Sequence, residues 1–127
     1  MIVFAFGLSL IVLLSSGLQA APRENPVELV MFESPVCEWC EKWHDEIGPI
    51  YPKTKEGQCA PLRTVFLHSP RPDDLKDVRG VVYTPTFVLM EAGEERGRVA
   101  GYPGDEFFWT MLGQVLSKLN NPCPLSD

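Results

Sequence analysis

The chain has 127 residues, with 11 Lys and Arg side chains against 17 Asp and Glu, which gives a formal net charge of −6. This length excludes multidomain enzymes and large barrels, because the apolar residues suffice for only one small core. The acidic balance argues against a nucleic-acid-binding protein, which would need a basic face for the phosphates.

Residues 1–20 form the first distinct segment and contain no charged side chain. Apolar residues dominate up to Leu14 and small residues follow up to Ala20, which is the layout of a secretory signal peptide. We therefore expect a signal peptide over residues 1–20 and a single domain over residues 21–127. An uncleaved membrane anchor is the alternative, although the apolar stretch is shorter than the roughly 20 residues of a membrane span. In either case the domain would lie outside the cytoplasm, where disulfides persist.

The remaining chain predicts alternating strands and helices. β-prone runs predict strands at residues 27–32, 62–67, 86–90 and 96–102, the last two joined by a solvent-exposed hairpin loop at 91–95. Helices are predicted at residues 37–47 and 105–119, with further helical turns at 51–57 and 73–78. In the last helix, the apolar residues with helical spacing should face the core: Phe107, Phe108, Met111, Leu112, Val115, Leu116 and Leu119. This order predicts one α/β domain with a four-stranded mixed sheet flanked by helices.

The motif Cys37-Glu38-Trp39-Cys40 lies between the first predicted strand and the first predicted helix. In this context a C-x-x-C motif indicates redox chemistry. Cys37 falls at the helix N-terminus, where unpaired N–H groups and the helix dipole favour a thiolate. Cys40 lies one turn further along, within disulfide reach. We expect Cys37 to exchange with a sulfur of a partner protein and Cys40 to resolve the mixed disulfide.

Cysteine pairs of this kind also have other uses in proteins. A structural zinc site would need four ligands, and covalent haem would need a His directly after the second Cys, where Glu41 stands. A purely structural disulfide remains an alternative, as does a metal-binding protein that uses Cys37, Cys40 and His44. We favour a surface or packing role for His44, and we expect no metal and no bound cofactor.

Two motifs together resemble the thioredoxin family: Cys37-Glu38-Trp39-Cys40, and Thr84-Pro85-Thr86 before the third strand. The resemblance extends over most of residues 26–120. It implies a thioredoxin fold, in the order βαβ and then β-hairpin-α, with a cis peptide bond before Pro85. It also implies that substrate docks at Glu38, Trp39, Thr84 and Pro85, with the backbone of Thr84 holding the substrate peptide.

Longer stretches narrow this resemblance. Residues 40–54, 60–63, 84–88, 101–102 and 107–109 resemble the SoxS thioredoxins of bacterial sulfur-oxidation clusters. The resemblance implies a periplasmic thiol-disulfide reductant that keeps the cysteine of the sulfur-carrier complex SoxYZ active. It also implies a membrane thiol transporter as the electron donor. A reductase for cytochrome c maturation, or for general periplasmic thiol repair, is the alternative.

Two positions depart from the common thioredoxin pattern. Met31 stands six residues before Cys37, where many thioredoxins have a buried Asp. Proton transfer at Cys40 must then use water or another group, and Glu33 is the nearest candidate, although we favour a solvated turn residue there. Glu38 places a carboxylate beside Cys37, which disfavours its thiolate. This stabilises the disulfide and predicts a reductant rather than a strong oxidant.

Cys59 and Cys123 are the remaining cysteines. Cys59 follows the first helix and Cys123 follows the last, and both helices should pack on the same face of the sheet. A structural disulfide between them is the first expectation, and it would stabilise the domain by about 4 kcal/mol on the chain-entropy model. Free thiols and a regulatory or intermolecular role are the alternatives.

Overall fold

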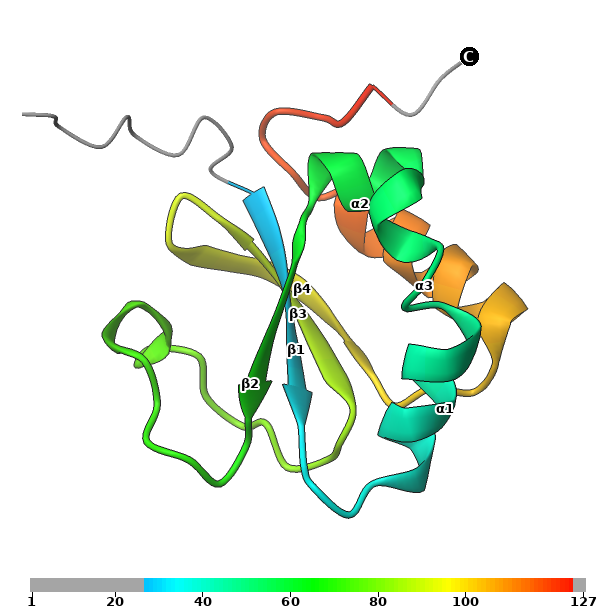
Figure 1. The fold of residues 1–127 in the computed structure, drawn as a ribbon. Helices are drawn as coiled ribbons and strands as arrows, with labels where there is room; N and C mark the ends of the chain where they lie inside the picture. The colour runs from blue at the N-terminus through cyan, green and yellow to red at the C-terminus, as the bar shows by residue number, and fades with distance from the viewer. Residues whose placement is uncertain (1–26, 125–127) are drawn as a thin grey trace, which may run out of the picture.

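The computed structural model describes residues 27–124 and contains a four-stranded mixed sheet (Figure 1). Its strands are β1 (Val27–Glu33), β2 (Leu62–Phe66), β3 (Thr86–Glu91) and β4 (Glu94–Ala100), in the spatial order β2-β1-β3-β4. β1 runs parallel to β2 and antiparallel to β3, and β3 runs antiparallel to β4. The end of β1, the end of β2 and the start of β3 therefore meet at one edge of the sheet.

The helices α1 (Glu38–Glu46), α2 (Lys55–Cys59) and α3 (Asp105–Leu116) lie on one face of this sheet (Figure 1). A 3-10 turn, η1 (Tyr51–Lys53), connects α1 to α2. This arrangement confirms the predicted thioredoxin fold. Within residues 27–124, no helix is long and apolar enough to cross a membrane. The predicted signal peptide at residues 1–20 lies outside the described residues.

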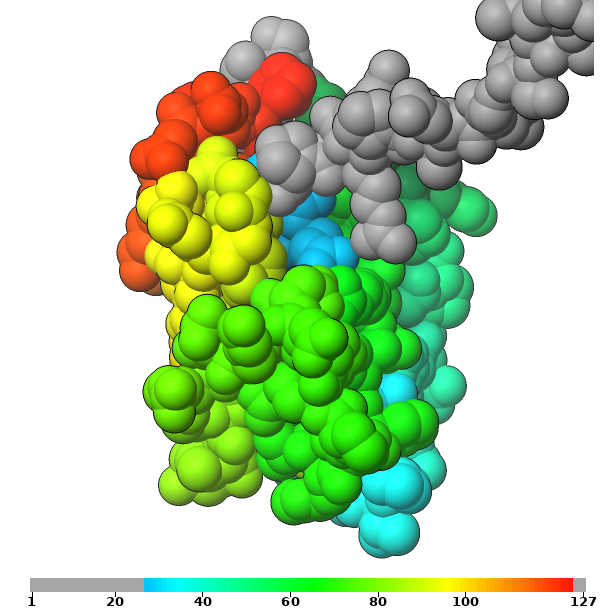
Figure 2. Space-filling model, turned by 90° about the vertical axis from the view of Figure 1, so that its left-hand side faces the viewer, coloured from blue at the N-terminus to red at the C-terminus, as the bar shows by residue number. Residues whose placement is uncertain are grey.

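The opposite face of the sheet is covered by the connection between β2 and β3, which we call the 67–85 segment (Figure 2). The predicted helical turn at 73–78 is shorter in the structure, where a 3-10 turn, η2, spans Asp73–Leu75. Leu75 and Val78 from this segment pack against Val30 and Phe32 of β1. The sheet is thus buried on both faces, which explains the apolar sequences of β1 and β3.

The larger part of the core lies between the sheet and the helices. Trp43 of α1 is fully buried, and its ring centroid lies 5.1 Å from Phe87 and 5.6 Å from Phe108. The prediction that Phe107 also faces the core is wrong, because its side chain is 61% exposed. Its neighbour Phe108 occupies the buried position instead, so the apolar face of α3 is narrower than the sequence pattern indicates.

The hairpin between β3 and β4 is also tighter than predicted. Its turn consists of only Ala92 and Gly93, both at positive φ, as two-residue hairpin turns require. The expected solvent-exposed loop at 91–95 is therefore wrong for Glu91, which ends β3 and is 3% exposed. Its carboxylate accepts hydrogen bonds from the backbone N–H groups of Asn120 (3.0 Å) and Asn121 (3.1 Å). Arg96 Nε donates to the same carboxylate (2.8 Å).

These contacts explain the electrostatics of Glu91. The hydrogen bond from Asn120 is the largest cause that holds the pKa of the Glu91 carboxyl below its usual range, and Asn121 and Arg96 act in the same direction. The carboxylate is therefore the stable form in the folded protein. It fixes the chain just after α3, on the way to Cys123.

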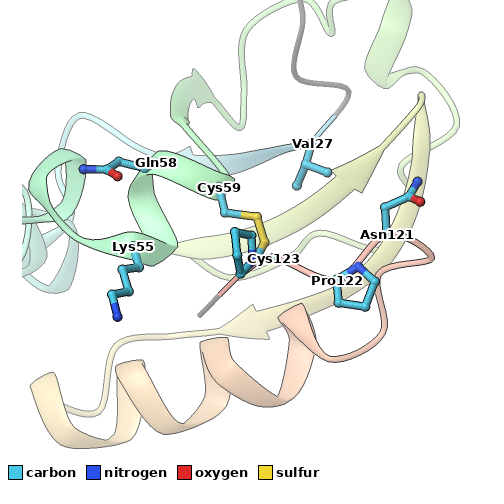
Figure 3. A pocket seen from close by; sticks show the side chains of 8 residues that line it. Val27, Lys55, Gln58, Cys59, Asn121, Pro122 and Cys123 are labelled. Carbon is cyan, nitrogen blue, oxygen red and sulfur yellow. A yellow bond between two sulfur atoms is a disulfide. The ribbon is translucent and has the colours of Figure 1, made fainter. Parts of the chain in front are cut away.

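Cys59, the last residue of α2, is joined to Cys123 by a disulfide, with the two Cα atoms 5.8 Å apart (Figure 3). The disulfide borders a hollow of about 350 Å³, which Val27 at the start of β1 also lines. Just beyond Cys59, the Tyr51 hydroxyl donates a hydrogen bond to the carbonyl of Ala60 (2.7 Å). Burial is the main cause that raises the pKa of the Tyr51 phenol above its usual range, so Tyr51 stays a donor.

Candidate active site

Cys37 and Cys40 lie at the edge of the sheet where β1 ends. Four residues after the end of β1, Cys37 occupies the N-cap position of α1, and its Sγ accepts a hydrogen bond from the backbone N–H of Cys40 (3.1 Å). The two cysteines form a disulfide with a Cα separation of 5.2 Å. Cys37 is 8% exposed and Cys40 is 3% exposed, so Cys37 is the more accessible of the two. Cys37 is therefore the sulfur that a partner protein would reach first.

The loop before β3 lies against the loop that carries Cys37. The peptide bond between Thr84 and Pro85 is cis, as the resemblance implies. The Oγ atoms of Ser34 and Thr84 are joined by a hydrogen bond of 2.9 Å, although the two residues are 50 positions apart in the sequence. On the other side, the backbone N–H of Gly101 donates to the carbonyl of Pro85 (2.7 Å). Thr84 and Pro85 are thus fixed between the C-x-x-C loop and the end of β4.

A shallow hollow of about 300 Å³ lies beside this junction, lined by the start of α1, the loop before β3, and the end of β4 with the connection that follows it. The lining residues are Trp39, Thr84, Ala100, Gly101, Tyr102 and Pro103. Trp39 is 52% exposed, as expected, and Val36 and Tyr83 add further exposed apolar surface. An apolar surface beside a buried reactive pair is suited to a protein or peptide substrate.

Tyr102, which lines this hollow, is held in place by a hydrogen bond. Its hydroxyl donates a hydrogen bond of 2.5 Å to Glu46 at the end of α1. Burial is the largest cause that raises the pKa of the Tyr102 phenol above its usual range, and the hydrogen bond to Glu46 acts in the same direction. The contact ties α1 to the connection between β4 and α3, which holds one wall of the hollow.

Glu33 and His44 form a close pair behind the cysteines. Glu33 is the last residue of β1, and its Oε2 lies 2.6 Å from Nε2 of His44. The side chain of Glu33 is 15% exposed, so it is not the solvated turn residue that the sequence favoured. His44 follows Cys40 by one helical turn, which places it on the same side of α1. Met31 is fully buried where many relatives have an Asp.

Several contributors to the site were not identified from the sequence. Ser34, Gly101, Tyr102 and Pro103 carry no sequence signal for the site, because their positions beside it depend on the assembled fold. Within residues 27–124, no three His, Cys, Asp or Glu side chains form a group that could hold a metal ion. His44, the third residue of the metal-binding alternative, pairs with Glu33.

The family model for the thioredoxin-like domain matches residues 14–116. The chain belongs to the thioredoxin-like family. It is a thiol-disulfide oxidoreductase with a Cys37–Cys40 pair, as the motif and its position at the start of α1 indicate.

Solved structures agree with this assignment. The reduced form of the periplasmic thioredoxin SoxS from Paracoccus pantotrophus is 46% identical, with a TM-score of 0.70, and the match covers 72% of this chain and 97% of that one. The thioredoxin NaTrxh from Nicotiana alata is 26% identical, with a TM-score of 0.51, over 72% of this chain and 75% of that one. The Malassezia sympodialis thioredoxin, at 22% identity and a TM-score of 0.53 over 71% and 77%, shares the fold. The comparison with curated proteins gives no significant match.

Proposed function

We propose that this thioredoxin-like protein is a periplasmic reductant of protein disulfides. The Cys37 thiolate attacks one sulfur of the partner disulfide, and the other partner sulfur leaves as a thiolate. The Cys40 thiolate then attacks Cys37, which closes the Cys37–Cys40 disulfide and releases the second partner sulfur. Two electrons pass to the partner, whose two sulfurs each take up a proton. The observation that carries the proposal is the position of Cys37 at the start of α1, beside the cis Thr84–Pro85 bond.

The substrate peptide docks on the backbone of Thr84, between Pro85 and the exposed ring of Trp39. The hollow beside Trp39 supports this proposal, because it continues the apolar surface away from the cysteines. The hydrogen bond between Ser34 and Thr84 supports it as well, because it holds the docking loop and the reactive loop in one arrangement. Glu38 lies in the first turn of α1 and contributes the polar part of the docking surface.

The direction of the reaction and the partner rest on different arguments. Glu38 disfavours the Cys37 thiolate and so favours the disulfide form of the enzyme, which is the property of a reductant. The likeness to a periplasmic SoxS thioredoxin supports the periplasm and a SoxYZ-type sulfur carrier as the partner. A membrane thiol transporter would return electrons to the Cys37–Cys40 disulfide, because the oxidised enzyme needs a reductant for each turnover.

Glu33 and His44 act together as the proton acceptor for Cys40. Cys40 must lose its proton before it attacks the mixed disulfide, and it is 3% exposed, so bulk water has little access. The short contact between Glu33 and His44 supports a shared role, because a carboxylate orients the imidazole. This pair replaces the buried Asp that many thioredoxins have at the position of Met31.

The Cys59–Cys123 disulfide has a structural role. It joins the end of α2 to the chain after α3, at a sequence separation of 64 residues. A disulfide that closes so long a loop restricts the unfolded chain strongly. The Cys59–Cys123 disulfide lies near the start of β1, away from the proposed substrate surface at the end of β1.

The test of the proposed function is the capture of mixed-disulfide partners with Cys40→Ser in periplasmic extract, followed by mass spectrometry. We expect a covalent complex with a sulfur-carrier protein that disappears on reduction. Cys37→Ser is the matched control and should capture nothing, because the attacking sulfur is missing. Recovery of apocytochromes without a sulfur carrier would support the cytochrome c alternative, and capture that persists in Cys37→Ser would contradict the assigned roles.

A further inference from the structure

A second hollow, of about 470 Å³, lies in the 67–85 segment, outside the active site. Three basic residues line it, Arg71, Lys76 and Arg79, and Ser69 adds a hydroxyl group. The whole chain has only 11 Lys and Arg residues and a net charge of −6. Three of those 11 therefore line this one hollow.

The other arginines of the described chain form ion pairs, unlike the arginines of this hollow. Arg63 pairs with Glu28 and Asp74, Arg96 pairs with Glu91, and Arg98 pairs with Glu95.

Within residues 27–124, by contrast, no carboxylate lies within 4.0 Å of the charged nitrogens of Arg71, Lys76 or Arg79. The nearby Asp74 and Asp77 line a separate hollow with Glu94 and Glu95. Arg71, Lys76 and Arg79 therefore form no ion pair with the described carboxylates, although Asp73, Asp74 and Asp77 lie on the same segment.

The basic hollow is also held in shape. The guanidinium of Arg71 lies over the ring of Phe32, 4.8 Å from its centroid, and donates a hydrogen bond to the carbonyl of Val78 (2.6 Å). Arg98 donates to the carbonyl of Arg79 (2.9 Å). Since Arg71 uses one N–H group for Val78 and a guanidinium has five, it keeps donors for an anion. Such preorganisation lowers the entropic cost of binding.

The basic hollow and the active site share one edge of the sheet. The 67–85 segment leaves the sheet at the end of β2 and returns at the start of β3, and both points lie at the edge where β1 ends (Figure 1). The same segment continues from Arg79 directly to Thr84, the residue that holds the substrate. A protein docked at Cys37 therefore extends toward the basic hollow when its chain runs along this edge.

We propose that the hollow formed by Arg71, Lys76 and Arg79 binds an acidic segment of the protein substrate, near the cysteine that reacts with Cys37. This inference rests on the proposed function and adds the charge of the partner to it. Carboxylates are the partner groups that match unpaired guanidinium and ammonium groups. Charge attraction of this kind accelerates the encounter and selects the partner more than it raises the final affinity.

The test uses synthetic peptides that each carry one cysteine in a mixed disulfide with thionitrobenzoate. An Asp-Asp-Asp triplet is placed at increasing distances on either side of the cysteine, and an Asn-Asn-Asn series is the neutral reference. The reduced protein is mixed with each peptide, and the second-order rate constant is measured at low and high salt. At the best spacing we expect the acidic peptide to react roughly tenfold faster than its neutral counterpart at low salt. High salt should remove this advantage.

The variant K76E/R79E should lose the advantage and keep its rate with the neutral peptides. The matched control is K53E/K118E, which makes the same charge change at two exposed lysines elsewhere and should keep the advantage. The proposal is wrong if K76E/R79E keeps the preference, if the control loses it equally, or if no spacing shows it. Binding of inorganic sulfate in the hollow, with no preference between the acidic and neutral peptides, would also overturn the proposal in favour of a small-anion site. Failure to react with neutral peptides would instead contradict the proposed function itself.

Discussion

At the scale of single residues, we propose that Glu38 sets the direction of the redox reaction. Its carboxylate follows Cys37 directly in the first turn of α1 and opposes the thiolate there. We predict that Glu38→Gln stabilises the reduced form and makes the enzyme more oxidising. The equilibrium constant with glutathione should shift toward the dithiol by roughly threefold. A glutathione titration read by thiol alkylation measures this shift.

The control for Glu38 is Asp45→Asn, which removes the same charge two turns further along α1. Asp45 is exposed, and we expect this variant to leave the equilibrium constant unchanged. An unchanged constant in Glu38→Gln, or a shift toward the disulfide, would show that another group sets the direction of the reaction.

A second prediction at this scale concerns Glu33. Glu33→Gln should slow the attack of Cys40 on a Cys37–thionitrobenzoate mixed disulfide by about tenfold at neutral pH, because His44 loses the carboxylate that orients its imidazole. Above the ordinary thiol pKa of about 8.5 the difference should disappear, since Cys40 then loses its proton to hydroxide. Stopped-flow release of thionitrobenzoate measures the rate. A loss that is equal at every pH would indicate a structural role for Glu33 instead.

At the scale of secondary-structure elements, α3 contributes to the core through a narrow face. Phe108 is fully buried and its ring contacts Trp43, Phe87 and Tyr102, whereas Phe107 points to solvent. We predict that Phe108→Ala lowers the free energy of unfolding by about 3–5 kcal/mol. Phe107→Ala, the matched control, should change it by less than about 0.5 kcal/mol. Urea denaturation followed by circular dichroism compares the two, and equal losses would contradict the assignment of the helix faces.

The β3–β4 hairpin carries a pH-dependent contact through Glu91. Hydrogen bonds lower the pKa of this carboxyl in the folded protein. The contact therefore stabilises the fold at pH values above the ordinary pKa range of a glutamate. This stabilisation is lost as the pH falls through the lowered pKa. The stability difference between the wild type and Glu91→Gln should therefore be largest at neutral pH and shrink as the pH falls below the ordinary glutamate range. Urea titrations at several pH values test this, and a difference that grows in acid would contradict it.

At the scale of the whole molecule, the Cys59–Cys123 disulfide joins two distant parts of the chain. The variant with both cysteines changed to Ser should lose about 4 kcal/mol of stability, because the unfolded chain regains the freedom of a loop of 64 residues. Its reaction rate with a small disulfide at low temperature should stay within about twofold of the wild type. Loss of the reaction in a folded variant would show that this disulfide takes part in catalysis.

The fold and the reactive pair could be predicted from the sequence because their signals are local. Cys37 and Cys40 are three residues apart, and the strands and helices around them have regular apolar patterns. The contact between Ser34 and Thr84 could not be predicted, because it joins residues 50 positions apart. Glu91 was misassigned for a similar reason: its partners Asn120 and Asn121 lie 29 and 30 residues away. Such polar contacts follow from the register of the sheet, which a single sequence does not specify.

The two disulfides lie at opposite edges of the sheet. Cys37 follows the end of β1, whereas Val27 at its start borders the hollow of Cys59 and Cys123. The seven residues of β1 separate them by roughly 20 Å, at about 3.3 Å per residue. Under the proposed function, the chain therefore needs an oxidant for the Cys59–Cys123 pole and a reductant for the Cys37–Cys40 pole. The distance between the poles allows each disulfide to be reached from its own side of the molecule.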